Sequence, residues 1–178
     1  MSTFLLIIGD REALGWILDA RRTAFPGAGK GAHRAEVRSL KIDDELMVYT
    51  TRGAFKNSTR DRGRVIGTAR VTSDLTQLDQ PVFFGGRGYP VGCDLELETL
   101  VPFGSGVNLA EHVSQLDALK DLGDSWSLRL RRPLLRISER DSKLLREQLL
   151  FAGTGIVNDE VVSGYSKWYR AQGSDSGG

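Results

Sequence analysis

A nine-residue segment of strict alternation places the strongest constraint on the fold of this chain. From Cys93 to Val101, one face carries Cys93, Leu95, Leu97, Thr99 and Val101, and the other carries Asp94, Glu96, Glu98 and Leu100. A period of two is typical of a β-strand that turns one face toward the core and the other toward solvent. Strands of this kind indicate antiparallel pairing.

Further strands and several short helices surround this segment. Strand patterns cover the apolar run Phe4 to Ile8, then Glu45 to Thr51, Arg64 to Ser73 and Trp126 to Arg131, where Pro133 marks an edge or bulge. Helices are predicted from the cap Asp10 to about Thr23, from Asn108 with Glu111, from Ser138 with Asp141 to about Phe151, and over 156–169. Five or six strands with inserted helices predict an α+β protein, a small closed or partly open, mostly antiparallel β-barrel decorated with short helices. A doubly wound fold is disfavoured because helices do not regularly separate the strands.

The length of 178 residues suits one domain with a short appendage. We expect the domain to span residues 1–152 and a docked C-terminal extension to cover 153–170, held through Val161, Tyr165 and Trp168. A Gly/Ser-rich tail, 171–178, is expected to be disordered. The run Phe4 to Ile8 is far too short for a signal peptide or membrane span, and the lone Cys93 cannot form an internal disulfide. These features favour a cytoplasmic protein with no membrane partner.

Positive charge is unevenly distributed although the net charge is only +1. Basic residues gather between Arg21 and Arg38, between Arg52 and Arg70, and again from Arg129 to Arg136, while acidic residues concentrate from Asp94 to Asp124. Segregation of this kind can create a face that binds a polyanion. The alternative is that these charges are merely solvated loops and strand edges.

The motifs of common enzymes and metal sites are missing from the sequence. His33 and His112 have no metal-ligand neighbours at a useful spacing, so no metal is expected. In the glycine-rich loop from Gly27 to Gly31, Lys30 is followed by Gly31 rather than Ser or Thr, which excludes a P-loop. The segment around Ser105 lacks the first glycine of a nucleophile elbow. We therefore expect no cofactor and no catalytic residues.

Aromatic residues near basic ones are the remaining candidates for a site. Phe25 follows the first predicted helix, and Phe55 lies in a basic loop. Bases stack on such rings with about 1–3 kcal/mol each, and nearby cations hold the backbone. For Trp16 and Tyr49 taken singly, a core role is favoured over a stacking role.

The order of these segments resembles the EVE family of the PUA-like superfamily, which is related to YTH and ASCH domains. The similar stretches are Gly9 to Glu12 after the first strand, Phe25-Pro26-Gly27, Leu40 to Tyr49, Val65 to Val71, Tyr89-Pro90, and Trp126 to Leu128 before the closing helix. Together they extend over roughly residues 3–151. Asp43 stands where the family usually has glycine, and Phe25-Pro26 replaces the commoner Trp-Asp-Gly-Val.

The resemblance implies a non-catalytic reader that holds one flipped, modified base in an aromatic pocket at the barrel mouth, with modified cytosine in DNA favoured. The implied pocket residues are Phe25, Tyr49, Thr51 and Trp126, with Trp16 as a further candidate. The expected contacts to the nucleic-acid backbone are Arg34, Arg52, Phe55, Lys56, Arg60 and Arg62. Effector nuclease or restriction components are candidate partners.

Two rival functions remain open. Some ASCH relatives look like small amidohydrolases or nucleases, and Lys41, Thr51 and Glu45 are the residue types that such a site would use. A YTH-like reader of modified RNA is the other rival, because 2′-hydroxyl contacts leave no signature in a sequence.

Overall fold

The structure, a computed structural model, describes residues 1–26, 33–56, 62–153 and 157–175, without the side chains of 33, 34, 168 and 170–175. The strands are β1 (Thr3–Ile8), β2 (Arg22–Phe25), β3 (Glu45–Thr50), β4 (Arg64–Val71), β5 (Thr76–Phe84), β6 (Arg87–Leu100), β7 (Val107–Asn108) and β8 (Leu134–Ile137). The helices are α1 (Arg11–Ala20), α2 (His33–Arg38), α3 (Glu139–Phe151) and α4 (Asp159–Asp175), and 3₁₀ turns form η1 (Leu109–Glu111), η2 (Val113–Gln115) and η3 (Lys120–Leu130).

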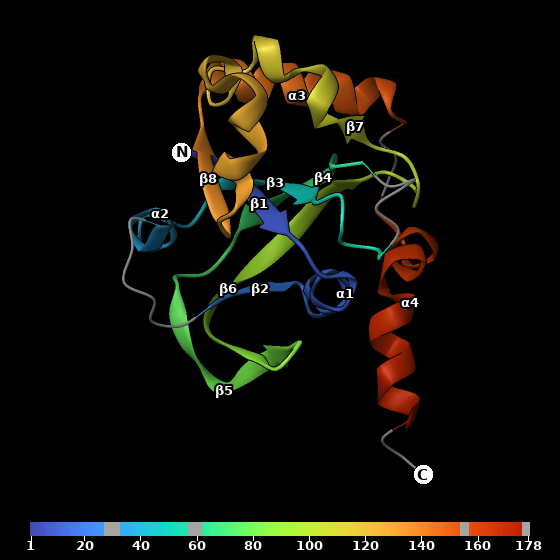
Figure 1. Cartoon of the computed structure of the whole chain (residues 1–178). Coiled ribbons are helices and arrows are strands. Elements are labelled where there is room, and N and C mark those ends of the chain that lie inside the picture. The colour runs from blue at the N-terminus through green and yellow to red at the C-terminus, as the bar shows by residue number, and fades with distance from the viewer. Residues whose placement is uncertain (27–32, 57–61, 154–156, 176–178) are drawn as a thin grey trace.

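One curled sheet contains all the strands of these described ranges (Figure 1). Its main path runs β2-β6-β4-β3-β1-β8, with β5 paired to β6 and β7 paired to β4. Only the β1–β3 pair is parallel among these pairings, so the prediction of a mostly antiparallel barrel with short helices is confirmed. Apolar side chains from β1, β3, β4 and β6 fill the interior, including the fully buried Phe4, Leu46 and Val65.

The long alternating strand is present, but a β-bulge changes which face its last residues occupy. Thr68 pairs with Thr99 whereas the next residue, Ala69, pairs with Leu97, so Glu98 is the extra residue. A bulge of this kind reverses the alternation beyond it. Leu100, which strict alternation puts on the outer face, is therefore buried at 1% exposure. The prediction for Leu100 was wrong because a bulge leaves no mark in the hydrophobic pattern.

The first helix is shorter than predicted. Asp10 caps it as expected, since its Oδ1 accepts hydrogen bonds from the amides of Glu12 and Ala13. The helix ends at Ala20 rather than near Thr23, because Arg21 adopts a left-handed conformation with φ 55°. The next residues form β2, which pairs with β6. Phe25 therefore ends a strand and is buried, although no strand was predicted after the first helix.

The segment from Trp126 to Arg131 is not a strand, which corrects a second prediction. Residues through Leu130 belong to η3, and the strand begins after Pro133 as β8, antiparallel to β1. An alternation of only a few residues does not distinguish a strand from turns of 3₁₀ helix. Ser138 does cap α3 as predicted, with its hydroxyl accepting from the amide of Asp141.

Two charged residues explain the turn before β3. The buried Asp44 accepts hydrogen bonds from the amides of Ser2 and Lys41, both at 2.8 Å. Asp43 has φ 75°, in the left-handed region that glycine adopts most easily. Aspartate tolerates this conformation better than most residues. This explains why aspartate can stand at a position where the EVE family, which the sequence resembles, usually has glycine.

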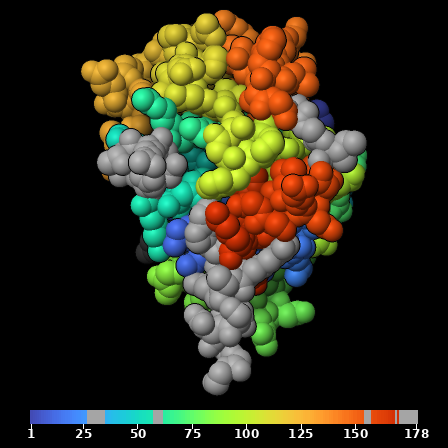
Figure 2. All heavy atoms as spheres, turned by 90° about the vertical axis from the view of Figure 1, so that its right-hand side faces the viewer, coloured from blue at the N-terminus to red at the C-terminus, as the bar shows by residue number. Residues whose placement is uncertain are grey.

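The C-terminal helix α4 packs against α1 and beside the segment after β6 (Figures 1 and 2). The hydroxyl of Tyr165 donates to the carbonyl of Val101 at 2.6 Å, and Phe103 meets the Tyr165 ring edge-on. Its helical backbone continues to Asp175, so residues 171–175 of the expected tail are helical, and 176–178 lie outside the described residues.

Close contact between α1 and α4 depends on Gly15. A Cβ atom at this position would lie 2.7 Å from the Cβ of Tyr169 and 3.1 Å from the Cα of Ser166. We expect Gly15→Ala to lower the free energy of unfolding by about 1–2 kcal/mol, because overpacking outweighs the better helix propensity of alanine. Thermal unfolding should show a Tm decrease of about 3–6 °C. Gly53→Ala is the matched control, because nothing lies within 4 Å of its added Cβ. An unchanged Tm in Gly15→Ala would contradict the close packing.

In the described part of the chain, no helix is long and apolar enough to cross a membrane.

Candidate nucleic-acid interface

The parallel pair β1–β3 gives the barrel two chemically different ends. Both strands begin at one end, with Thr3 paired to Glu45, and both finish at the other, with Ile8 paired to Thr50. One cavity, here called the ion-pair cavity, lies at the starting end and has a volume of about 750 Å³. Two further cavities lie where the strands finish.

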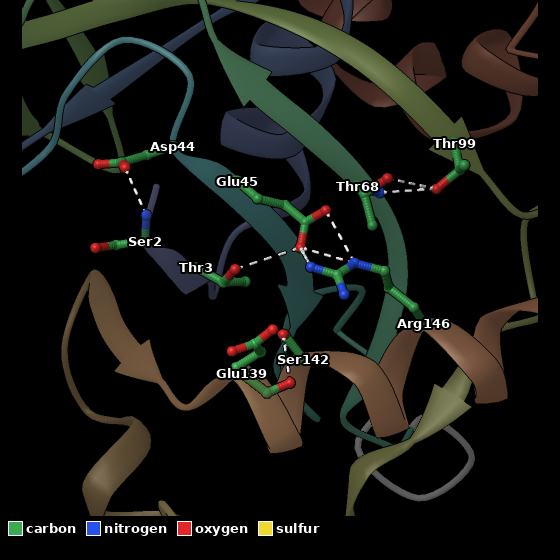
Figure 3. A network of polar contacts seen from close by, with 9 residues as sticks. All are labelled: Ser2, Thr3, Asp44, Glu45, Thr68, Thr99, Glu139, Ser142 and Arg146. Carbon is green, nitrogen blue, oxygen red and sulfur yellow. Dashed lines mark hydrogen bonds and ion pairs between the residues drawn. The ribbon is translucent and has the colours of Figure 1, made fainter.

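Charges in the ion-pair cavity neutralise one another. Arg146 of α3 binds both carboxylate oxygens of Glu45, with its Nη2 at 2.7 Å and its Nε at 3.1 Å (Figure 3). Arg70 pairs with Glu96 at 2.6 Å and with Glu98 at 3.5 Å. Bidentate pairs of this kind fix geometry. The cavity therefore ties α3 to the start of β3, and its ion pairs leave little charge for a ligand.

Backbone hydrogen bonds hold the opposite end together. The amide of Thr51 donates to the carbonyl of Ile8, and the amide of Arg11 donates to the carbonyl of Ala54, each at 3.0 Å. These bonds join the exits of β1 and β3 to the start of α1. The two cavities at this end adjoin, because both are lined by Thr51, Leu130 and Arg131.

The first of them, here called the apolar cavity, has a volume of about 550 Å³. Asp10, Ala13 and Ile17 line it from one face of α1, as their spacing of three and four residues requires. Mainly apolar groups complete the wall among the described residues: Leu6, Ile7, Ile8, Ala24, Phe25, Pro26, Tyr89, Leu130 and Pro133, with Gly9, Thr23, Thr51, Arg87, Arg131 and Arg132. Apolar walls with few polar groups are typical of small-molecule sites.

The polar side chains of the apolar cavity are Asp10, Thr23, Thr51, Arg87, Arg131 and Arg132. Thr23 is fully buried, and its hydroxyl has no hydrogen-bond partner among the described residues. Asp10 uses Oδ1 for the α1 amides, and within the described residues Oδ2 is not engaged. Arg132 pairs with Glu36 at 3.5 Å. A flat, partly polar ring is the kind of ligand that such a cavity suits.

The second cavity, here called the arginine cavity, has a volume of about 690 Å³. Its described lining is Tyr49, Thr51, Arg52, Gly53, Arg62, Gly63, Asn108, Ala110, Trp126, Ser127, Leu130 and Arg131. Three arginines from three separate segments converge there, and that lining includes no carboxylate. Positive charge concentrated in this way favours an anionic ligand.

Tyr49 forms part of the arginine cavity and packs tightly against Gly63. An added Cβ on Gly63 would fall within bonding distance of the Tyr49 hydroxyl, so only glycine fits there. Burial raises the pKa of Tyr49 to about 12, which keeps its hydroxyl protonated at neutral pH. Tyr49 is thus a neutral, fixed wall.

The predicted pocket residues divide between the two cavities. Tyr49 and Trp126 line the arginine cavity, Phe25 lines the apolar cavity, and Thr51 lines both. Trp16 lines neither, because it packs against Phe84 with the ring centroids 5.9 Å apart.

The predicted backbone contacts are placed as follows. Arg52 and Arg62 line the arginine cavity, and Lys56 is exposed near them in sequence. Phe55 instead packs edge-on against Phe103 at 5.1 Å. Arg60 and the loop from Gly27 to Gly31 lie outside the described residues, as does the side chain of Arg34.

Residues that the sequence did not suggest also line the cavities. Asp10 and Asn108 were assigned only as helix caps, and Ala13 was not singled out. Tyr89 lies on β6 before the alternating segment, where no strand was predicted. Arg131 could be suspected from the sequence, because it belongs to the basic group from Arg129 to Arg136.

The three residues that the rival hydrolase or nuclease would use, Lys41, Glu45 and Thr51, do not come together in one site. Glu45 begins β3 and Thr51 follows its end, and at about 3.3 Å per residue they lie roughly 20 Å apart. Glu45 is bound to Arg146, and Lys41 is exposed before the strand. Among the described residues, no group of three or more His, Cys, Asp or Glu side chains could hold a metal ion.

Three solved structures have a similar fold, and two of them are complexes with a nucleic acid. The human THYN1 protein in complex with 5-methylcytosine-containing DNA is similar, with a TM-score of 0.53 and 14% identity over 88% of this chain and 100% of that one. The Mmi1 YTH domain in complex with RNA has a TM-score of 0.54 and 14% identity, over 85% of this chain and 79% of that one. A hypothetical protein from Leishmania major has a TM-score of 0.55 and 13% identity, over 85% and 96%.

No family model matches the chain, and no curated protein matches it by sequence. At these identities the likeness shows the fold alone: a small α+β barrel like those of the Mmi1 YTH domain and THYN1.

Proposed function

We propose that this chain is an EVE-type nucleic-acid reader that holds one extruded, modified base in the apolar cavity. The observation that carries the proposal is the pairing of that cavity with the adjoining arginine cavity, through the shared Thr51, Leu130 and Arg131. An apolar slot suits a base, and a cluster of arginines suits the phosphates beside it.

The apolar cavity has the contacts that an extruded base requires. Phe25, Tyr89 and Pro26 supply apolar wall, and extrusion costs a few kcal/mol that stacking and edge hydrogen bonds offset. Asp10 supplies an acceptor, which is the group that pairs with the exocyclic amino group of cytosine. The hydroxyl of Thr51, a part-buried residue that lines both cavities, can contact the rest of the edge.

Likeness to the THYN1 complex supports 5-methylcytosine in DNA as the first ligand to test, and the Mmi1 complex supports RNA as the alternative. The carboxylate of Asp10 favours a base with an amino donor. Cytosine, adenine and guanine all have an exocyclic amino group, so the Asp10 carboxylate does not choose among them. Methylated cytosine is preferred on the likeness to the THYN1 complex.

The test is a titration with oligonucleotides that differ in one base. Short DNA duplexes carrying cytosine, 5-methylcytosine or 5-hydroxymethylcytosine at one position, and the matching RNAs, are measured at moderate salt. We expect one modified DNA to bind at least about tenfold more tightly than its plain counterpart. Tighter binding of a modified RNA than of any DNA would show that the ligand is RNA rather than DNA. Equal affinity for all probes would refute it.

A further inference from the structure

The arginine cavity is lined by more kinds of side chain than the binding of a phosphate alone requires. Its described lining combines Arg62 and Arg131 with the part-buried indole of Trp126 and the side chain of Asn108. The described lining includes no carboxylate beside Arg62 and Arg131, whereas in the ion-pair cavity Glu45 and Glu98 pair with Arg146 and Arg70. A cavity of about 690 Å³ with cations, an aromatic ring and an amide fits a whole nucleotide better than a simple anion.

We infer that the arginine cavity binds the nucleotide directly next to the held base, with its base on Trp126 and its phosphate between Arg62 and Arg131. This inference rests on the proposed function, which assigns the neighbouring apolar cavity to the modified base. Because the two cavities share a wall, adjacent nucleotides of one strand can occupy them together.

Each lining group then has a specific role. Arg131 borders both cavities, so it lies where the linking phosphate between the two nucleotides must pass. Tyr49, held against Gly63, forms a rigid back wall. Asn108 uses its Oδ1 to cap η1 and its Nδ2 to contact Glu111, which fixes the side chain beside the second base. Because stacking on an aromatic ring tolerates every base, this second subsite is expected to bind the neighbouring nucleotide without selecting its base.

The experiment uses DNA with one modified cytosine and an abasic residue on its 5′ or 3′ side. Wild-type protein should lose about tenfold in affinity, or about 1.4 kcal/mol, when the abasic residue occupies one particular side. Trp126→Ala should bind the intact and that abasic DNA equally, yet still prefer the modified base. Trp126→Leu keeps apolar packing and should behave likewise, which separates lost stacking from misfolding.

Salt dependence tests the phosphate contacts. Arg62→Ala and Arg131→Ala should each reduce the slope of log affinity against log salt by about one. If wild type prefers the modified base but an abasic residue on either side changes affinity by less than about twofold, the second subsite does not exist. If modified and plain intact DNA bind alike, the proposed function fails, and this inference fails with it.

Discussion

Replacing Ala13 with leucine is expected to abolish recognition of the modified base while the protein stays folded. Ala13 is part-buried on the face of α1 that lines the apolar cavity, between Asp10 and Ile17. An isobutyl group in place of a methyl group would protrude into the cavity beside Asp10, where the edge of the base is expected to lie. Losing stacking and edge contacts together should weaken binding to the modified oligonucleotide on the order of 100-fold.

The matched control for Ala13→Leu is Ala20→Leu on the same helix. Ala20 is exposed and lines neither cavity. Leucine is nearly as good a helix former as alanine, so both variants should unfold within about 1 kcal/mol of the wild type. Binding is measured by titration, and stability by urea unfolding. Undiminished preference for the modified base in Ala13→Leu would exclude the apolar cavity as its site.

Asp10→Asn is expected to remove most of the preference for a cytosine-type base. Asparagine caps helices about as well as aspartate, so α1 should be retained. With Oδ1 still accepting from the helix amides, the amide NH₂ would replace the second carboxylate oxygen. An acceptor at the base edge would thereby become a donor. Two donors facing each other should lower the affinity by about 1–3 kcal/mol, or about 5- to 150-fold.

Glu12→Gln is the control for the lost charge. Glu12 is also in the first turn of α1 but does not line the apolar cavity. If both variants weaken binding equally, and equally for modified and plain DNA, then Asp10 contributes only its charge. A selective loss in Asp10→Asn alone supports the edge contact.

The sequence predicted the barrel because its signals were periodic and local. Alternation from Cys93, the caps at Asp10 and Ser138 and the apolar run of β1 each have a direct structural cause. Pairing β1 parallel to β3 was not predictable, since register and direction depend on contacts distant in the sequence. Strand β5 was missed because Asp79, Gln80 and Pro81 interrupt its hydrophobic pattern. These residues lie where the pairing of β5 with β6 is irregular.

Site prediction identified suitable residues but not their grouping. The resemblance brought Phe25, Tyr49, Thr51 and Trp126 together as one pocket, whereas Leu130 and Arg131 stand between two cavities. That partition arises because η3 brings Trp126 and Arg131 to the barrel end as turns rather than as a strand. The place of Ala13 in the cavity wall could not be predicted from the sequence. A small side chain indicates a cavity only when the residues on the opposite wall are known.

The central claim is that a single modified base occupies the apolar cavity, and a capture experiment tests it most directly. Immobilised wild-type protein is incubated with a mixture of DNA fragments that carry different modified bases. The retained DNA is then digested, and its nucleosides are quantified by mass spectrometry against the input. We predict that one modified nucleoside, with 5-methyldeoxycytidine expected first, is enriched on the wild type but not on Ala13→Leu. Retained DNA with the same nucleoside composition as the input on both proteins would contradict the claim.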